Sequence, residues 1–442
     1  MHVAVDDTDS IDEMCTTYII SEIMSRKKYD IIGNPELVRL NPNISYKTRG
    51  NGALNINLGR GSGKKKITGM INNEYIYSYE RLDEEPDEDD LMDFVYSIVN
   101  DYSVKTDIKT SPGIVISKDR FDENLYYKAL EEDISIEFIE NYLKDRAIYK
   151  KINTGHGIIG SVASLAWNRK KITYELLDYK YPNYGYIDKN TKMKIAEIPE
   201  KYNTTFNNID RNNNYPAIFP KQKTPVIFGI RGINDVDLIK IYDEIKNSYN
   251  LNDRRCVIYE TNQGTDDHII NDPEFLSDLG SYAITGIISS HPYVIRGGHR
   301  FINMEYKNIN VKLSAFEPTK EFRKLIDSLL PGDIVRAYGS YIDGTLKLEK
   351  LMVSSVSRLF RKEPPICGSC HVKTRSKGNM DYRCPVCKKR YKNPNIYEVG
   401  RDVKPGYYEV PVIARRHLSM PVKLSNYFGE FNDMYKWDSG YR

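Results

Sequence analysis

Three carboxylates stand within four positions near the start of the chain. Asp6, Asp7 and Asp9 follow the apolar run HVAV, and Thr16 and Thr17 lie where a helix is expected to begin. Like charges this close repel one another unless a cation lies between them, and Mg²⁺ shared between carboxylates and phosphate oxygens is the usual occupant. The helix would direct its first N–H groups at the same phosphates. The alternative interpretation is an Asx turn followed by an N-cap threonine.

A glycine-rich basic loop is the next candidate for phosphate contact. In YKTRGNG, Lys47 and Arg49 flank a turn at Gly50 where the backbone is able to approach a ligand closely. The more basic stretch GRGSGKKK, at 59–66, lacks the glycine spacing of a Walker A loop, and no Ser or Thr follows its first lysine. We interpret 59–66 as the flexible tip of a basic hairpin.

The most specific single motif is a pair of Cys-x-x-Cys units, CGSC and CPVC, separated by 13 residues. Four thiolates on two tight turns form a tetrahedral Zn²⁺ site, and the metal is structural because protein fills every position. The expected ligands are Cys367, Cys370, Cys384 and Cys387. Disulfides are the alternative, which a cytoplasmic location disfavours.

Positive charge is concentrated at the C-terminal end. Residues 361–442 hold 17 Lys and Arg against 8 Asp and Glu, although the whole chain carries only +3. This indicates a surface for a polyanion such as nucleic acid, confined to the ribbon and a basic tail. The candidate contacts are Lys388, Lys389, Arg390, Arg415 and Arg416.

The length of 442 residues predicts several domains. No apolar run approaches the ~18 residues of a membrane span. A secretion signal is also missing from the N-terminus, so we expect a cytoplasmic protein.

Hydrophobic patterns outline the elements that would hold these residues. The first part predicts a strand at 2–5, a helix at 16–28, a strand at 53–58, and an acidic loop at 83–90 leading into a helix at 91–100. Around an insertion at 181–223, strands at 147–152, 173–180, 225–230 and 255–261 and helices at 158–167 and 235–246 predict a ferredoxin-like β-α-β-β-α-β domain.

The following segment predicts a five-stranded OB barrel. Strands are expected at 282–291, 299–306, 309–316, 333–341 and 345–355, with a helix at 319–330 between the third and fourth. OB barrels often hold single-stranded nucleic acid. The complete prediction is an α+β multidomain chain, with an N-terminal α/β domain (1–146), a ferredoxin-like domain (147–268), the barrel (269–360), and a zinc ribbon with a basic tail (361–442).

These motifs together resemble one known family. DDTDS followed by MCTTY, then YKTRGNG, TNQGTDDH, the barrel, the two cysteine pairs and ARRHLSMPV occur in the order found in TiaS, the archaeal 2-agmatinylcytidine synthetase family. The resemblance implies an ATP-using, kinase-like N-terminal domain that is followed by the other three. It also implies ligation of agmatine to C2 of the wobble cytidine of the minor isoleucine tRNA, so that AUA is decoded.

The resemblance also implies roles for single residues. Thr16 matches the threonine that accepts a phosphoryl group, and ATP is cleaved to AMP. The acidic motif Asp6, Asp7 and Asp9 would handle phosphates, with Mg²⁺ at Asp7 and Asp9. Lys47, Arg49 and Gly50 fall on the ATP-binding loop. The tRNA would be held by its anticodon loop and acceptor region, and no membrane is involved.

The agmatine site is less defined by sequence. A guanidinium needs a carboxylate or carbonyl partner, for which Asp266 and Asp267 are candidates. Gly155 and His156 would form a glycine-rich wall, although His156 is equally explained as a structural histidine. Asn262 and Gln263 would read a base edge or cap a turn.

Two other functions stay open from the residues alone. One is a non-enzymatic single-strand binder, and the other is a phosphotransferase acting on another substrate. The choice of agmatine over lysine rests on the resemblance.

Overall fold

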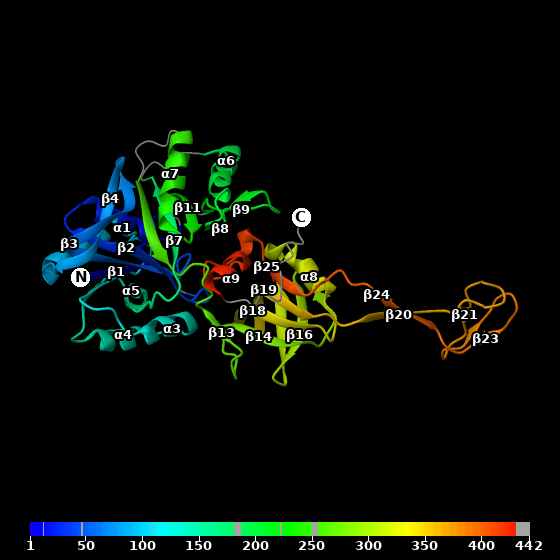
Figure 1. Cartoon of the computed structure of the whole chain (residues 1–442). Helices are drawn as coiled ribbons and strands as arrows, with labels where there is room; N and C mark the ends of the chain where they lie inside the picture. Colours follow the sequence, from blue (N-terminus) through cyan, green and yellow to red (C-terminus); the bar gives the residue numbers. More distant parts are fainter. Residues whose placement is uncertain are drawn as a thin grey trace.

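The computed structural model describes residues 1–429 apart from positions 12, 46, 108, 181–186, 222 and 250–254. Three packed parts form the main body, and a small ribbon projects from it on a two-stranded stalk (Figure 1). None of the helices in this described part is long and apolar enough to cross a membrane. The predicted insertion lies partly, and residues 430–442 wholly, outside the described residues.

A ten-stranded sheet runs without a break through the first two parts, in the order β6-β5-β1-β3-β4-β2-β12-β7-β11-β8. The N-terminal part supplies β1 (His2–Asp6), β2 (Asp30–Arg39), β3 (Gly52–Ile71), β4 (Glu74–Glu84), β5 (Gly113–Ser117) and β6 (Ile148–Lys151). Its helices are α1 (Thr16–Ser25), α2 (Glu88–Tyr102), α3 (Glu123–Glu131), α4 (Ile136–Leu143) and α5 (Gly157–Leu165).

The first strand is apolar throughout because both of its faces are covered. Val3 and Val5 pack in a core that includes side chains of α1 and α2, whereas Ala4 packs in a core that includes side chains of α3, α4 and α5. Successive side chains of a strand point to opposite faces, so both sets of neighbours select apolar residues. β1 therefore ends in the interior of the domain, and the carboxylates that follow it start from a buried position.

The helix boundaries of this part differ from prediction in two places. α1 ends at Ser25, three residues before the predicted end. α2 begins at Glu88 inside the acidic run, because Asp87 caps it by accepting a hydrogen bond from the Asp90 amide. Carboxylates in a first turn are favoured by the helix dipole, so the last three residues of the predicted loop, 88–90, are helical.

The prediction of a hairpin tip at 59–66 is wrong. These residues lie within β3, which pairs with β4 through several register shifts. The turn comes later, at Asn72 and Asn73, which both have positive φ as a tight hairpin requires. A Cβ on Gly61 would lie 2.7 Å from the Tyr79 side chain, so glycine permits the close approach of the two strands.

The second part is ferredoxin-like, but its elements are not all those predicted. It comprises β7 (Thr173–Tyr179), α6 (Lys189–Glu200), β8 (Thr205–Phe206), β11 (Val226–Gly232), α7 (Asp235–Tyr249) and β12 (Arg255–Thr261), with the short pair β9 (Ile209–Asp210) and β10 (Tyr215–Pro216). The antiparallel order β12-β7-β11-β8 is the split β-α-β-β-α-β arrangement. The predicted first strand, at 147–152, instead pairs with β5 of the N-terminal part, and the predicted helix, at 158–167, packs on the strands of that part. The predicted insertion contains the missing helix.

The third part confirms the predicted five-stranded barrel. The barrel strands are β14 (Ser281–Ile288), β16 (Arg300–Tyr306), β17 (Ile309–Ala315), β18 (Ile334–Ile342) and β19 (Thr345–Ser355), and the β14–β16 pairing closes the ring. β13 (Ile269–Asn271) and β15 (Tyr293–Val294) extend the sheet, and the helical turn Glu317–Thr319 and α8 (Phe322–Ser328) precede β18.

The ribbon is an excursion from the barrel, and the chain returns from it. β20 (Leu359–Glu363) and β24 (Asn395–Val399) form the stalk, and β21 (Arg375–Ser376), β22 (Tyr382–Arg383) and β23 (Arg390–Tyr391) form the ribbon. β25 (Gly406–Glu409) then pairs with β19. The turn Val412–Ala414 and α9 (Val422–Phe428) follow, and Leu424 packs against Phe206 of the ferredoxin-like part. Residues 404–429 are therefore integral to the body rather than a basic tail.

This return predicts different outcomes for two deletions. A chain that ends at residue 360 loses Val410, Leu418, Met420 and Leu424, which are almost completely buried. Each buried aliphatic side chain contributes roughly 1.5–3 kcal/mol, so we expect a large fall in unfolding temperature. Removal of 364–394 alone, with Asn-Gly joining the cross-strand partners Glu363 and Asn395, should leave that temperature close to wild type. Differential scanning calorimetry of both variants tests this, and equal losses would contradict it.

Candidate active site

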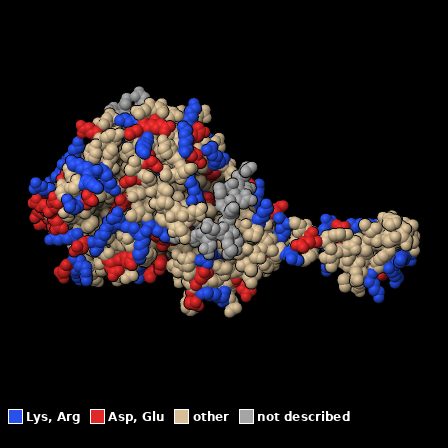
Figure 2. Space-filling view, in the orientation of Figure 1, with Lys and Arg blue, Asp and Glu red and all other residues tan. Residues whose placement is uncertain are grey.

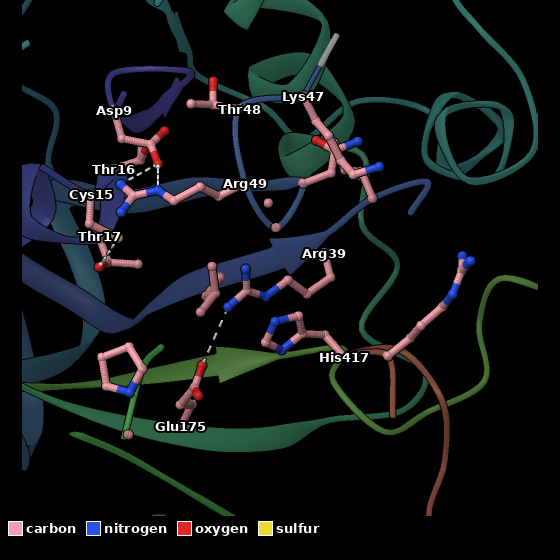
Figure 3. A pocket seen from close by; sticks show the side chains of 18 of the residues that line it. Asp9, Cys15, Thr16, Thr17, Arg39, Lys47, Thr48, Arg49, Glu175 and His417 are labelled. Carbon is pink, nitrogen blue, oxygen red and sulfur yellow. Dashed lines mark hydrogen bonds and ion pairs between the residues drawn. The ribbon is translucent and has the colours of Figure 1, made fainter. Parts of the chain in front are cut away.

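A cavity of about 540 Å³ lies where the N-terminal part, the ferredoxin-like part and the returning C-terminal segment meet. Asp6, Asp7 and Asp9 line one end, next to the starts of α1 and α5. Figure 3 shows Asp9, Thr16 and Arg49 together at this end and Arg39, Glu175 and His417 grouped apart from them. The two ends differ in chemistry.

Glycines bring α5 against the end of β1. A Cβ on Gly157 would lie 2.5 Å from the Asp6 carbonyl oxygen, and a Cβ on Gly160 would lie 1.9 Å from Asp6 Oδ2. On the opposite side, a Cβ on Gly113 of β5 would lie 2.0 Å from the Ile158 nitrogen. No other residue type permits this approach, so GHGIIG has glycine at these positions for packing. The start of α5 is thereby fixed directly behind the first carboxylate.

The three carboxylates have different partners. Asp6 Oδ1 accepts a hydrogen bond from the Asp7 amide at 2.7 Å. Asp7 adopts φ of +58°, and its Oδ1 accepts a hydrogen bond from Thr48 Oγ1 at 3.1 Å. Asp9 Oδ2 pairs with Arg49, whose Nε lies 2.7 Å away. A positive φ is unfavourable for an aspartate. At Asp7 this backbone conformation sets the direction of the first carboxylate after β1.

Burial dominates the electrostatics of this end. It raises the pKa of Asp6 well above the ordinary value, and the charge of Asp7 adds to the effect. Burial and then Asp9 raise the pKa of Asp7 to about 7. Burial also raises the pKa of Asp9, although Arg49 opposes it. Their anionic forms therefore need more positive charge than the surrounding protein supplies, which is the property of a cation site.

Thr16 is not the N-cap of α1, as one interpretation of the sequence had it. The cap is Cys15, which makes no side-chain capping bond, and Thr16 is the first helical residue. Thr16 Oγ1 accepts a hydrogen bond from Thr8 Oγ1 at 3.2 Å. α5 also starts without a side-chain cap, at His156. The start of α1 therefore presents backbone N–H groups at the acidic end, an arrangement that suits phosphate oxygens. The first amides of α5 are already used, because Gly157, Ile158 and Ile159 donate to backbone carbonyls.

The basic loop lies beside this end, and Lys47, Arg49 and Gly50 all line the cavity. Lys47 Nζ donates to the Ile44 carbonyl at 2.9 Å and also to the Pro42 carbonyl, which holds the loop closed. Burial and then Arg416 lower the pKa of Lys47. Arg49 has a side chain that is only 9% exposed.

The opposite end contains a charged network that sequence patterns did not indicate. Glu175 Oε1 pairs with Arg231 Nε at 2.9 Å, and Arg39 Nη2 lies 3.8 Å from Glu175 Oε2. Gln263 Oε1 accepts hydrogen bonds from Arg231 Nε at 3.1 Å and from His417 Nδ1 at 2.8 Å. Arg39 and then burial lower the pKa of His417 well below its usual value, so the ring is neutral.

The remaining predicted residues divide into two groups. His156, Arg415 and Arg416 line the cavity, and Arg415 is 6% exposed with its guanidinium on Glu409 and Asn207. The two arginines therefore do not belong to an exposed basic tail. The residues that lie outside the cavity lining are Gly155, Asn262, Gln263, Asp266 and Asp267.

The residues outside the lining have framework contacts. Asn262 bonds to the backbone N–H and carbonyl of Arg39 and to Tyr126. Asp267 accepts a hydrogen bond from Tyr126 at 2.8 Å, and Asp266 pairs with Lys350 of the barrel. Their side chains are consequently already partnered, and the geometry does not direct them at a ligand.

The four cysteines of the ribbon converge. The Sγ atoms of Cys367, Cys370, Cys384 and Cys387 lie within 4.8 Å of one another. Zn–S bonds of about 2.3 Å in a tetrahedron place sulfurs roughly 3.8 Å apart, so the set fits one Zn²⁺. Lys388, Lys389 and Arg390 are exposed on the same ribbon, where Figure 2 shows basic side chains far from the main body.

Comparison with known proteins places this geometry in a family. Three family models match the chain, namely the TiaS TCKD domain over residues 2–153, the TiaS FLD domain over 155–268 and the TiaS C-terminal zinc ribbon domain over 364–403. An isoleucine tRNA 2-agmatinylcytidine synthetase TiaS of Thermoplasma volcanium is 46% identical over 97% of this chain and 98% of its own length. The chain belongs to the TiaS family.

Other TiaS proteins support the same placement. The TiaS of Archaeoglobus fulgidus is 34% identical over 97% of this chain and 98% of its own length. A crystal structure of TiaS in complex with an isoleucine tRNA and ATP superposes with a TM-score of 0.82 at 31% identity, covering 98% of both chains. A complex of TiaS with an isoleucine tRNA, AMPCPP and agmatine gives 0.77 at 29% identity, covering 95% of this chain and 96% of the other.

The neutral His417 predicts a pH dependence of stability in this TiaS chain. The folded protein resists protonation of this ring, whereas the unfolded chain protonates it near pH 6.5, so stability falls as pH drops below that value. At pH 5 the loss is about 2 kcal/mol. His417→Gln should reduce the slope between pH 7 and 5 in chemical denaturation. The exposed His291→Gln is the control, and equal slopes in both variants would contradict the prediction.

Proposed function

We propose that this chain ligates agmatine to C2 of the wobble cytidine of the minor isoleucine tRNA with ATP as the energy source. The observation that carries the proposal is the acidic end of the cavity, where three carboxylates, the start of α1 and Arg49 meet. Related TiaS structures hold an isoleucine tRNA with ATP, and an isoleucine tRNA with AMPCPP and agmatine.

The chemistry explains why ATP is needed. The C2 carbonyl of cytosine is amide-like, and its oxygen is a poor leaving group. The terminal phosphoryl group of ATP is transferred to that oxygen, and water cleaves the remaining ADP to AMP and inorganic phosphate. The phosphate formed on the C2 oxygen then departs with the C2–O bonding electrons. The agmatine amine then forms the C2–N bond and loses a proton to an acceptor.

The triphosphate is assigned to the acidic end. The start of α1 offers backbone N–H groups, and Lys47, Arg49 and Arg416 offer positive charge to the transferring phosphoryl group. Mg²⁺ fits the carboxylates because burial raises the pKa values of Asp7 and Asp9 even though Arg49 pairs with Asp9. Asp7 and Asp9 would hold the ion, which would neutralise phosphate charge. Thr16, at the edge of this group, is placed to receive a phosphoryl group.

The amine substrate is assigned to the apolar wall. Ile218 and Phe219 are buried and line the cavity together with Val412. This wall suits the four-methylene chain of agmatine, and the wobble base would enter beside His156. Because Asp266 and Asp267 lie outside the cavity lining, we give them no part in holding the guanidinium. The exposed ribbon cations Lys388, Lys389 and Arg390 are assigned to the acceptor region of the tRNA.

Mass spectrometry of the tRNA tests the proposal directly. The purified chain is incubated with ATP, agmatine and a transcript of the minor isoleucine tRNA, and nuclease digests are searched for cytidine that has gained agmatine and lost water. A transcript with uridine at the wobble position is the matched control, and lysine replaces agmatine in a parallel reaction. We expect modified cytidine, together with AMP, only with the wobble cytidine and agmatine. Binding of tRNA without product would favour the single-strand binder, and ADP without modified tRNA would favour a phosphotransferase.

Substitution of Thr16 separates the chemical role of the hydroxyl from its structural role. Thr16→Ala should reduce agmatine transfer by at least tenfold, while tRNA affinity and unfolding temperature stay near wild type. Thr16→Ser keeps the oxygen and should retain most activity. With ATP labelled at the γ-phosphate, wild type and Thr16→Ser should carry label and Thr16→Ala should not. Near-normal product formation by Thr16→Ala would show that the hydroxyl is not used.

A further inference from the structure

A β-bulge in the barrel places two buried charged side chains against the ferredoxin-like part and the C-terminal segment. In the pairing of β18 with β19, Tyr338 is opposite Lys350 and Gly339 is opposite Leu348, so Glu349 is the extra residue. A Cβ on Gly339 would lie 2.1 Å from the Lys347 carbonyl oxygen, so the bulge requires glycine opposite it. Bulges re-aim the side chains of the strand that contains them.

Lys350 binds the end of the ferredoxin-like part and the C-terminal segment together. Its side chain is 1% exposed, and its Nζ contacts the Asp266 carboxylate and donates to the Met420 carbonyl at 2.9 Å. Asp266 Oδ1 accepts a hydrogen bond from the Met420 amide at 2.7 Å. The segment that lines the cavity is therefore attached to the barrel and to the body at the same point.

Glu349 makes a second contact between the barrel and the rest of the molecule, and it includes Arg416, which lines the cavity. Its Oε2 lies 3.2 Å from His268 Nε2, and its Oε1 lies 3.4 Å from Arg416 Nε. The carboxylate is 4% exposed. Burial by itself raises the pKa of Glu349, but His268, Arg416 and Lys350 outweigh it and lower the pKa to about 2. The barrel thus holds a permanent negative charge against Arg416.

Arg416 is the member of this group that reaches the cavity. It lines the wall, it donates from Nη1 to Asn43 Oδ1 at 2.7 Å, and its charge lowers the pKa of Lys47. Two facing cations repel each other, and a phosphate between them removes the repulsion. The direction of the Arg416 guanidinium depends on two oxygen atoms, one from Asn43 in the N-terminal part and one from Glu349 in the barrel.

We propose that Glu349 is a positioning residue for the ligation reaction, which acts from the barrel by orienting Arg416 toward the phosphate end of the cavity. The ribbon cations assigned to tRNA extend from this barrel on the β20–β24 stalk, and the Glu349–Arg416 contact joins the barrel to the cavity wall. The inference rests on the proposed function, because it assigns Arg416 to the transferring phosphate.

A purely structural ion pair makes a different prediction. Loss of a buried carboxylate that only holds the parts together lowers the unfolding temperature and reduces activity regardless of what occupies position 416. A positioning residue loses its effect when the side chain it orients is removed. The double-mutant cycle measures this difference.

The experiment compares full-length wild type, Glu349→Gln, Arg416→Gln and the double variant in agmatine transfer to the minor isoleucine tRNA. We expect each single change to lower kcat roughly ten- to a hundredfold, as for the loss of a charge-assisted contact. The KM for tRNA should stay within about twofold. In the Arg416→Gln background, Glu349→Gln should add less than twofold. Glu305→Gln, the same substitution at an exposed position of the barrel, is the control and should leave kcat unchanged.

The outcomes separate the two proposals. Absence of agmatine transfer by wild type would overturn the proposed function, whereas transfer by wild type with multiplying losses in the double variant would overturn the positioning role. Loss of stability in Glu349→Gln with normal kcat would also overturn it. If Glu349→Gln does not fold, Glu349→Asp keeps the charge but withdraws it from Arg416. It is then measured in the same two backgrounds with the same criterion.

Discussion

Buried negative charge at the end of β1 is the constraint on which the site depends. Asp6, Asp7 and Asp9 are held where burial raises their pKa values, so their ionised forms must be balanced from nearby. Arg49 pairs with Asp9, and the start of α1 lies at the same end of the cavity. Gly157 and Gly160 of α5 are also needed, because only a residue without a side chain lets the helix start so close to Asp6.

The path of the chain decides which residues complete the cavity. After the ribbon, residues 404–429 return to the barrel and then reach the ferredoxin-like part. Their backbone bonds to residues 264–266, and Arg415, Arg416 and His417 enter the cavity wall. One segment thereby connects the ribbon, the barrel and the site.

Sequence patterns succeeded where one rule dominates. The buried strand at 2–5 and the barrel strands follow from hydrophobic periodicity, and the cysteine spacing identified a set that converges in the structure. They failed where tertiary contacts decide. The strand at 147–152 fits a ferredoxin-like order equally well, but it pairs with β5. Glycines at 59–66 suggested a turn, yet Gly59 and Gly61 lie inside β3 and permit its close approach to β4.

The sequence by itself determined the chemistry that the protein carries, because Asp6, Asp7, Asp9, Thr16 and the cysteines are local clusters whose residue types limit what they bind. Only the tertiary structure decided which distant residues join them. Arg39, Glu175, Arg231 and His417 come from separate segments and meet at one end of the cavity. Asp266 and Asp267 are instead committed to Lys350 and Tyr126. The physical reason is that a carboxylate or guanidinium in the interior must be paired, and the identity of the partner depends on which strands the fold brings together.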